Sequence, residues 1–123
     1  MSDVTFILLY VEDVARSAAF WSKALEKPVP ESSANFAVLP AAPGLMLGLW
    51  RRDNVAPAAA GGAGAGEIAI TLADDAEVEA AHARWAAQGA RIAQAPTHMD
   101  FGYTCVALDP DGHRLRAFRP SPP

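Results

Sequence analysis

The sequence predicts an α+β fold in which two βαβββ modules follow one another along the chain and share a central groove. The first observation is a repeat, in which an apolar, strand-like run is twice followed by a helical pattern. The steps from Val14 to Val78 and from Trp21 to Trp85 are both 64 residues (78 − 14 and 85 − 21). The second observation is that further strand-like runs follow each helical pattern. A length of 123 residues suits one domain built from both modules.

The first module is expected to contain one helix and several strands. Its opening strand covers residues 5–11, which are apolar after Thr5. Asp13 can cap the helix over residues 13–25, because its carboxylate can accept a hydrogen bond from a free first-turn N–H. The helix then carries an apolar stripe at helical spacing: Val14, Ala18, Trp21 and Leu25. Further strands are expected at residues 36–39 and 45–50, and a weaker edge strand with two prolines near residues 28–31.

The second module, about residues 66–120, repeats the order of the first, about residues 1–52. A Gly- and Ala-rich linker, residues 53–65, joins them as a connector or as a lid over the groove. The second helix has a capping box at Asp74 and Glu77 and a C′ glycine at Gly89. Its strands are expected at residues 67–72, 91–94, 101–108 and 114–119. The sequence DPDG at 109–112 predicts a hairpin turn between the last two strands.

Alternation along the strands assigns side chains to faces. Ile68, Ile70 and Leu72 should pack on the helix, which leaves Glu67 on the groove face. The strand at 5–11 is apolar on both faces, which predicts that both are covered. By the same parity the groove face receives Phe6, Leu8, Tyr10, Met46, Gly48 and Trp50. In the last strand Leu115 and Ala117 should point inward, and Arg114, Arg116 and Phe118 outward or into the groove. This surface suits a flat organic ligand.

Composition excludes several classes of function. The chain is 51% hydrophobic and 20% charged, with a net charge of −4, and no basic stretch has interleaved aromatic residues, so we expect no nucleic-acid partner. No apolar run approaches the ~18–20 residues of a membrane span. The start, Met1-Ser2-Asp3, lacks the basic region of a secretory signal. A single cysteine, Cys105, fits a reducing compartment, and we expect a cytoplasmic protein with Cys105 buried in a strand.

Two segments resemble a known family. Residues 8–21, LLYVEDVARSAAFW, are similar to the opening signature of the vicinal-oxygen-chelate superfamily, and residues 109–116, DPDGHRLR, to its closing signature. This superfamily includes glyoxalase I, extradiol dioxygenases, and the bleomycin and fosfomycin resistance proteins. The resemblance covers nearly the whole chain and implies a glyoxalase/bleomycin-resistance-like open sheet with a central groove. It does not fix the chemistry, because the superfamily spans enzymes and binding proteins.

The resemblance also implies where a metal would be held. Metal-using members hold their ion with His, Gln or Glu at four equivalent strand positions. Carried over to this chain, these positions fall on Phe6, near Gly48, on Glu67 and on Arg116. Only Glu67 could ligate, and an arginine would place a permanent positive charge beside the cation. We therefore expect no metal and no other cofactor.

The remaining resemblance is to drug-binding members, namely the bleomycin-type sequestration proteins and, more closely, the phenazine antibiotic resistance type. Those proteins bind planar aromatic compounds between aromatic side chains without a metal, and they usually form dimers. Three features fit this subgroup: Trp50 before the linker, the Glu67-Ile68 pair, and the stretch of residues 101–104. The resemblance thus implies a small planar aromatic ligand and a homodimer.

The predicted site has no catalytic residue. The expected ligand-binding residues are Phe6, Tyr10, Met46, Trp50, Glu67, His98, Phe101 and Arg116. Several alternatives stay open at this point. Trp50 could instead be a core or dimer contact, and Glu67 and Arg116 could pair with each other or with a ligand. His98, in the loop expected before Phe101, is the histidine best placed to reach the groove, whereas Trp21 and Trp85 belong to the core.

Three functions are compatible with this sequence. The leading hypothesis is a metal-independent binding protein that sequesters a planar aromatic antibiotic or metabolite. The second is a glyoxalase- or dioxygenase-like metalloenzyme with rearranged ligands, for instance Glu67 and His98. The third is a protein-interaction module whose groove is filled by side chains or by a partner subunit.

Overall fold

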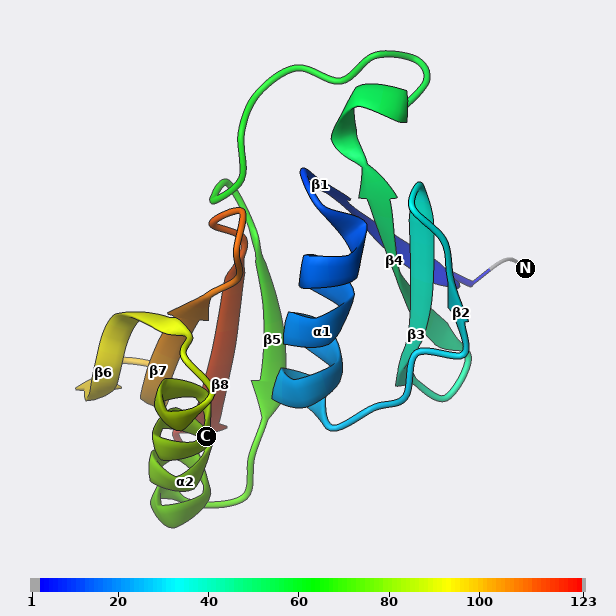
Figure 1. Ribbon diagram of the computed structural model, residues 1–123. Coiled ribbons are helices and arrows are strands. Elements are labelled where there is room, and N and C mark those ends of the chain that lie inside the picture. The colour runs from blue at the N-terminus through cyan, green and yellow to red at the C-terminus, as the bar shows by residue number, and fades with distance from the viewer. Residues whose placement is uncertain (1–2, 123) are drawn as a thin grey trace. The chain divides into compact units, whose positions relative to one another are not determined.

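The computed structural model describes residues 3–122 and divides them into two compact units. The first unit ends at Gly61 and the second begins at Gly62, a boundary that falls inside the expected linker. Met1 and Ser2, on which the secretory-signal argument depends, lie outside the described residues, as does Pro123. Each unit contains one α-helix and a four-stranded sheet (Figure 1), which confirms the predicted tandem α+β modules.

The first unit has the predicted order of elements. Its elements are β1 (Phe6–Val11), α1 (Val14–Leu25), β2 (Glu31–Ser32), β3 (Phe36–Ala42), β4 (Leu45–Arg51) and the short 3₁₀ turn η1 (Arg52–Asn54). The strands lie in the order β1-β4-β3-β2, with β1 parallel to β4 and the other pairs antiparallel. The weak strand expected near residues 28–31 forms just after its prolines, at Glu31–Ser32. It lies at the sheet edge, where prolines are tolerated.

Helix α1 begins and packs as its sequence predicts. The Oδ1 of Asp13 accepts a hydrogen bond from the backbone N–H of Arg16 at 3.1 Å, which satisfies one of the free donors of the first turn. Trp21 is fully buried, as are Leu39, Leu47 and Leu49 of the sheet beneath it. Burying one such leucine side chain stabilises the fold by about 1.5–3 kcal/mol.

The second unit repeats the topology of the first. Its elements are β5 (Glu67–Thr71), α2 (Asp75–Ala87), β6 (Arg91–Met99), β7 (Gly102–Leu108) and β8 (Arg114–Pro120). The strand order is β5-β8-β7-β6, with β5 parallel to β8. In both units, therefore, the first strand lies at one edge of the sheet and pairs in parallel with the last strand. Neither helix within residues 3–122 has the length and apolar character needed to cross a bilayer.

The capping box and the hairpin turn of the second unit are both confirmed. The backbone N–H of Glu77 donates to Asp74 Oδ1 at 2.8 Å, and Glu77 Oε2 accepts from the N–H of Ala73 at 2.7 Å. Gly89 follows α2 with a φ of +88°, as its C′ position requires. Between β7 and β8, the buried Asp109 accepts at Oδ1 from two backbone N–H groups of the turn, those of residues 111 and 113.

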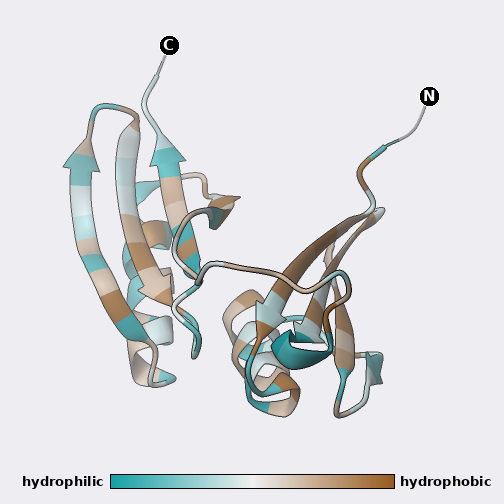
Figure 2. Ribbon diagram, turned by 90° about the horizontal axis from the view of Figure 1, so that it is seen from above, coloured by the Kyte–Doolittle hydropathy of each residue, from teal (hydrophilic) through white to brown (hydrophobic). Residues whose placement is uncertain are grey.

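The predicted faces are confirmed in β8 and only partly in β1. Leu115 and Ala117 are fully buried and alternate with the side chains of Arg114, Arg116 and Phe118. In β1, however, Phe6 is 46% exposed and Leu8 is 41% exposed, so the prediction that both faces are covered was wrong. Figure 2 shows the strands of the unit that carries the N-terminus as largely brown, whereas teal segments interrupt those of the other unit. The apolar side chains of Phe6 and Leu8 in β1 thus lie on an exposed face of the sheet.

Strand β6 is longer than predicted, and this moves His98. The expected strand ended at Gln94, but β6 continues through Pro96 to Met99. Two register shifts, between Ile92 and Gln94 and between Gln94 and Thr97, bend this edge strand and accommodate the proline. His98 therefore lies in a strand rather than in the expected loop.

Candidate functional site

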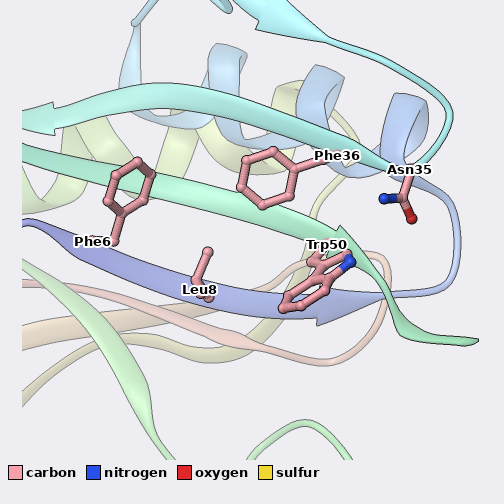
Figure 3. Close-up of a pocket in the computed structure, with 5 residues that line it drawn as sticks. All are labelled: Phe6, Leu8, Asn35, Phe36 and Trp50. Carbon is pink, nitrogen blue, oxygen red and sulfur yellow. The ribbon is translucent and has the colours of Figure 1, made fainter. Parts of the chain in front are cut away.

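An apolar pocket of about 500 Å³ lies on the sheet face of the first unit (Figure 3). Its lining residues come from β1, from β4, from the first position of β3 and from the residue before it: Phe6, Leu8, Asn35, Phe36 and Trp50. The volume falls within the range of about 300–1,000 Å³ that is usual for small-molecule sites. Four of the five lining side chains are apolar and three of them are aromatic, so the pocket suits an aromatic ring system.

Strand register brings these residues together. In the parallel pair β1–β4, Leu8 lies opposite Gly48 and Tyr10 opposite Trp50. In the antiparallel pair β3–β4, Phe36 lies opposite Trp50. Residues opposite one another share a face of the sheet, so three strands contribute to one continuous apolar surface.

Gly48 makes room for the side chains that line this surface. A Cβ at this position would lie 2.5 Å from Cδ2 of Leu8 and 2.9 Å from Cζ of Phe36, closer than real Cβ contacts allow. Leu8 and Phe36 therefore close over the glycine backbone and form the base of the pocket. Any larger residue would push both side chains into the space above them.

Two perpendicular ring contacts hold Trp50. The ring of Tyr10 lies 6.2 Å from that of Trp50 with an interplanar angle of 80°, and the ring of Phe36 lies 6.4 Å away at 83°. Edge-to-face pairs of this kind contribute about 0.5–1.5 kcal/mol each beyond the area that they bury. The indole is thereby preorganised at the wall of the pocket, which lowers the entropic cost of stacking a ligand ring on it.

The corresponding face of the second unit carries an ion cluster instead. Nε of Arg116 donates to Glu67 Oε1 at 2.9 Å, and Nη1 donates to Thr104 Oγ1 at 2.9 Å and to Gln94 Oε1 at 3.4 Å. The guanidinium carbon also lies 5.4 Å from the ring centroid of Phe101. The structure therefore pairs Glu67 with Arg116, one of the two arrangements that the sequence left open.

A second arginine, Arg114, also lies beside Glu67. Nε of Arg114 lies 3.4 Å from Glu67 Oε2, within ion-pair range but without the geometry of a hydrogen bond. The hydrogen bond from Arg116 and the positive charges of Arg116 and Arg114 hold the pKa of the Glu67 carboxyl below its usual value, against the opposing effect of burial. Glu67 is thus an ionised partner of two arginines at neutral pH.

The residues at the family's metal positions do not fit a divalent cation. Phe6 has no donor atom, Gly48 has no side chain, and the Glu67 carboxylate is engaged by Arg116. A divalent ion needs several oxygen or nitrogen donors, and a guanidinium supplies none. Over residues 3–122 no three His, Cys, Asp or Glu side chains come close enough to hold a metal ion.

His98 belongs to the opposite face of the second sheet. Its ring lies 4.4 Å from that of Tyr103, its partner in β7, and the Tyr103 hydroxyl donates to Glu79 of α2 at 3.0 Å. His98 is therefore on the α2 side, whereas Phe101 contacts Phe118 and Arg116 on the other side. His98, which was expected to reach the groove from a loop, thus lies on the face of its sheet opposite Arg116.

Cys105 is a core residue, as predicted. Its side chain is almost completely buried, and this burial raises the pKa of the thiol. A raised pKa suppresses the thiolate, which is the nucleophilic form.

The predicted ligand-binding residues thus fall into two groups that belong to different units. In the first unit Phe6 and Trp50 line the pocket and Tyr10 supports Trp50, whereas Met46 lies beside Phe6 in register without lining the pocket. In the second unit Glu67, Phe101 and Arg116 join one cluster. Their roles toward a ligand stay predictions.

Sequence reasoning missed two lining residues, Asn35 and Phe36. The pairing of Phe36 with Trp50 could have been inferred by counting parity across β3 and β4. No comparable signal marks Asn35, which precedes the strand.

Comparison with known proteins identifies the family of this fold. The family model described as Glyoxalase/Bleomycin resistance protein/Dioxygenase superfamily matches residues 4–117. Comparison with the curated proteins gives no match.

Several solved structures are similar to the chain. The solution NMR structure of a protein from Agrobacterium tumefaciens is 39% identical and has a TM-score of 0.88; the match covers 99% of this chain and 100% of that one. A glyoxalase-related enzyme from Fulvimarina pelagi is 20% identical with a TM-score of 0.86, covering 97% and 88% of the two chains. A lactoylglutathione lyase from Agrobacterium tumefaciens is 19% identical with a TM-score of 0.77, covering 97% and 94%. At these lower identities the likeness to the two enzymes concerns the fold alone.

Proposed function

We propose that this chain, which belongs to the Glyoxalase/Bleomycin resistance protein/Dioxygenase superfamily, is a metal-independent binding protein that sequesters a planar aromatic compound. The observation that carries the proposal is the pocket over Gly48, with its three aromatic side chains and a volume of about 500 Å³. The ligand class is a flat, fused-ring antibiotic or metabolite of the phenazine type.

The pocket supports binding rather than chemistry. Its lining residues offer rings for stacking and one amide, but no nucleophile, acid or base. The four positions where metal-using relatives hold their ion carry a phenylalanine, a glycine and an arginine-paired glutamate, together with that arginine. A glyoxalase- or dioxygenase-like metalloenzyme would need donors elsewhere, and the proposed pair of Glu67 and His98 lies on opposite faces of its sheet.

Tryptophan fluorescence tests the proposal directly. Trp21 and Trp85 are fully buried in the two cores, whereas Trp50 lines the pocket, so a ligand that stacks there should quench mainly Trp50. We expect saturable quenching by phenazine that is the same with chelator and with added divalent metal. Trp50→Phe should remove the signal, and binding to that variant can be followed by equilibrium dialysis.

A control variant separates the two units. Met99→Ala removes an exposed apolar side chain from the second unit and should leave phenazine binding unchanged, whereas Phe36→Ala should weaken it at least tenfold. Binding that appears only with added metal would favour the metalloenzyme. Absence of binding by any planar compound, together with tight self-association in sedimentation, would favour the interaction module. The expected homodimer is tested in the same sedimentation experiment.

A further inference from the structure

We infer that the side-chain amide of Asn35 selects the ligand, and that the pocket takes planar aromatic compounds with a hydrogen-bond acceptor on an edge of the ring system. This inference rests on the proposed function and narrows its ligand class. An aromatic ring nitrogen or a ring carbonyl has the required chemistry.

Asn35 occupies a defined place in the pocket. Figure 3 shows Phe6 at one end of the row of lining side chains and Asn35 at the other, beside Phe36 and Trp50. The other four lining residues are apolar, so the amide is the one polar side chain among those that line this pocket. A ligand ring stacked along the row would place its edge near Asn35.

The backbone of Asn35 is fixed on both sides. Its N–H donates to Ser33 Oγ at 3.3 Å, and its carbonyl accepts from the N–H of Arg51 at 2.8 Å, where β3 meets the end of β4. These bonds hold the residue at the mouth of the pocket.

The side-chain amide is oriented by a neighbour. Oδ1 of Asn35 accepts a hydrogen bond from Nδ2 of Asn54, in the turn η1, at 2.8 Å. In this orientation the bond engages the oxygen of Asn35, and turning the Asn35 amide alone would set two N–H groups against each other, so the two amides can exchange only together. Across residues 3–122, Nδ2 of Asn35 donates no hydrogen bond to a protein group, so its two N–H bonds are available to a ligand.

An available donor beside an apolar pocket discriminates between ligands of equal shape. A ligand that carries an acceptor replaces the water that the amide loses, whereas an isosteric hydrocarbon leaves the donor unpaired. Because Asn35 is itself exposed, part of this cost is relieved by solvent. We expect a preference of about fivefold to tenfold for the acceptor-bearing ligand.

Three tricyclic probes of similar outline test the inference. Phenazine carries two ring nitrogens that accept, anthracene carries no polar atom, and carbazole carries an N–H that donates. Dissociation constants are measured by quenching of Trp50 at low protein concentration in the same buffer. We expect phenazine to bind about fivefold to tenfold more tightly than anthracene or carbazole.

The variant Asn35→Asp provides the matched test. A carboxylate keeps the shape of the residue and can still accept from Asn54, so the local structure is retained, but the donor is replaced by an acceptor. The preference for phenazine over anthracene should disappear, and carbazole should become the favoured ligand. Gln94→Glu, which makes the same amide-to-carboxylate change in the second unit, should keep the wild-type order.

The outcomes distinguish a failure of the role of Asn35 from a failure of the proposed function. Binding of all three probes with equal affinity, or of carbazole in preference, would overturn the role of Asn35 and leave the proposed function standing. A phenazine preference that survives in Asn35→Asp would overturn it as well. If no probe binds, the proposed function fails and the inference with it.

Discussion

Replacing Glu67 by glutamine tests whether the ion cluster of the second unit stabilises its sheet. Glu67 in β5 and Arg116 in β8 bridge adjacent parallel strands at 2.9 Å. The Arg116 side chain is 13% exposed and that of Glu67 33% exposed. Glutamine keeps the shape and one acceptor oxygen but removes the charge, so a mostly buried guanidinium loses its counter-ion.

The expected loss of stability follows from this partial burial. Breaking a fully buried ion pair costs about 3–5 kcal/mol, and an exposed pair contributes about 0.2–1 kcal/mol. A pair that is buried on the arginine side and one-third exposed on the carboxylate side should fall between these limits. We expect Glu67→Gln to lower the free energy of unfolding by about 1–2 kcal/mol at pH 7.

The chain contains a matched control. Arg51 and Asp53 form an ion pair of nearly the same length, 2.8 Å, but their side chains are 46% and 65% exposed. Asp53→Asn makes the same change of charge in a solvated pair and should cost at most about 0.5 kcal/mol. Both variants are compared with the parent by urea denaturation followed by far-ultraviolet circular dichroism.

The loss should also depend on pH. Because the pKa of Glu67 is lowered in the folded protein, chiefly by the hydrogen bond from Arg116, the folded state binds fewer protons than the unfolded state. The stabilisation is therefore complete well above the ordinary pKa of 4.5 and declines as the pH falls through the lower folded value. The difference between the parent and Glu67→Gln should shrink from pH 7 to pH 3. Equal losses in Glu67→Gln and Asp53→Asn, or a difference that persists unchanged at pH 3, would refute the reasoning.

Three further substitutions test individual positions of the two units. Gly102 has a φ of +148°, and a Cβ there would lie 2.0 Å from the carbonyl oxygen of Arg119. Gly102→Ala should therefore lower the free energy of unfolding, measured by urea denaturation, by about 2–4 kcal/mol. Gly66→Ala, with open space around the residue, should change this free energy little. Gly48→Ala should push the flexible ends of two side chains into the pocket and weaken phenazine binding about tenfold in the fluorescence titration, with a stability change of at most about 1 kcal/mol. Asp109→Ala should cost about 1–3 kcal/mol in the same urea assay because two turn N–H groups lose their acceptor, and Asp109→Asn, which keeps an acceptor oxygen, should lose less.

The elements that sequence reasoning located correctly are those set by local chemistry. The capping box of Asp74 and Glu77, the glycine after α2 and the turn at Asp109 each depend on atoms a few residues apart. The burial of Trp21 and Trp85 follows from helical spacing, which is also local. These signals do not depend on which strands pair, so the sequence alone could reveal them.

The errors arise where pairing between strands decides the outcome. The strand was expected to end at Gln94, whereas β6 continues through Pro96, a residue that is unfavourable within a paired strand. The strand continues because it lies at the sheet edge and its two register shifts accommodate the proline. Each shift changes which face the following residues take, and the two together restore the alternation, so His98 shares the α2 face with Ile92; what the sequence did not show is that the strand extends as far as His98. Asn35 was missed for a related reason: it enters the pocket from outside a strand, where alternation assigns no face.

The repeated fold also explains why equivalent faces of the two units differ in chemistry. The same parallel register places Leu8 opposite Gly48 in the first unit and Ala69 opposite Arg116 in the second. In the first unit the large side chain is on the opening strand and the glycine leaves space that aromatic residues line. In the second unit the small residue is on the opening strand, and the long Arg116 side chain occupies the face with Glu67 as its counter-ion. A permanent charge on such a face must be paired or solvated, whereas an apolar face gains free energy by covering a flat apolar molecule. The identity of the residue at one register position, glycine or arginine, therefore determines whether this face is suited to hold a ligand or holds its own ion pair.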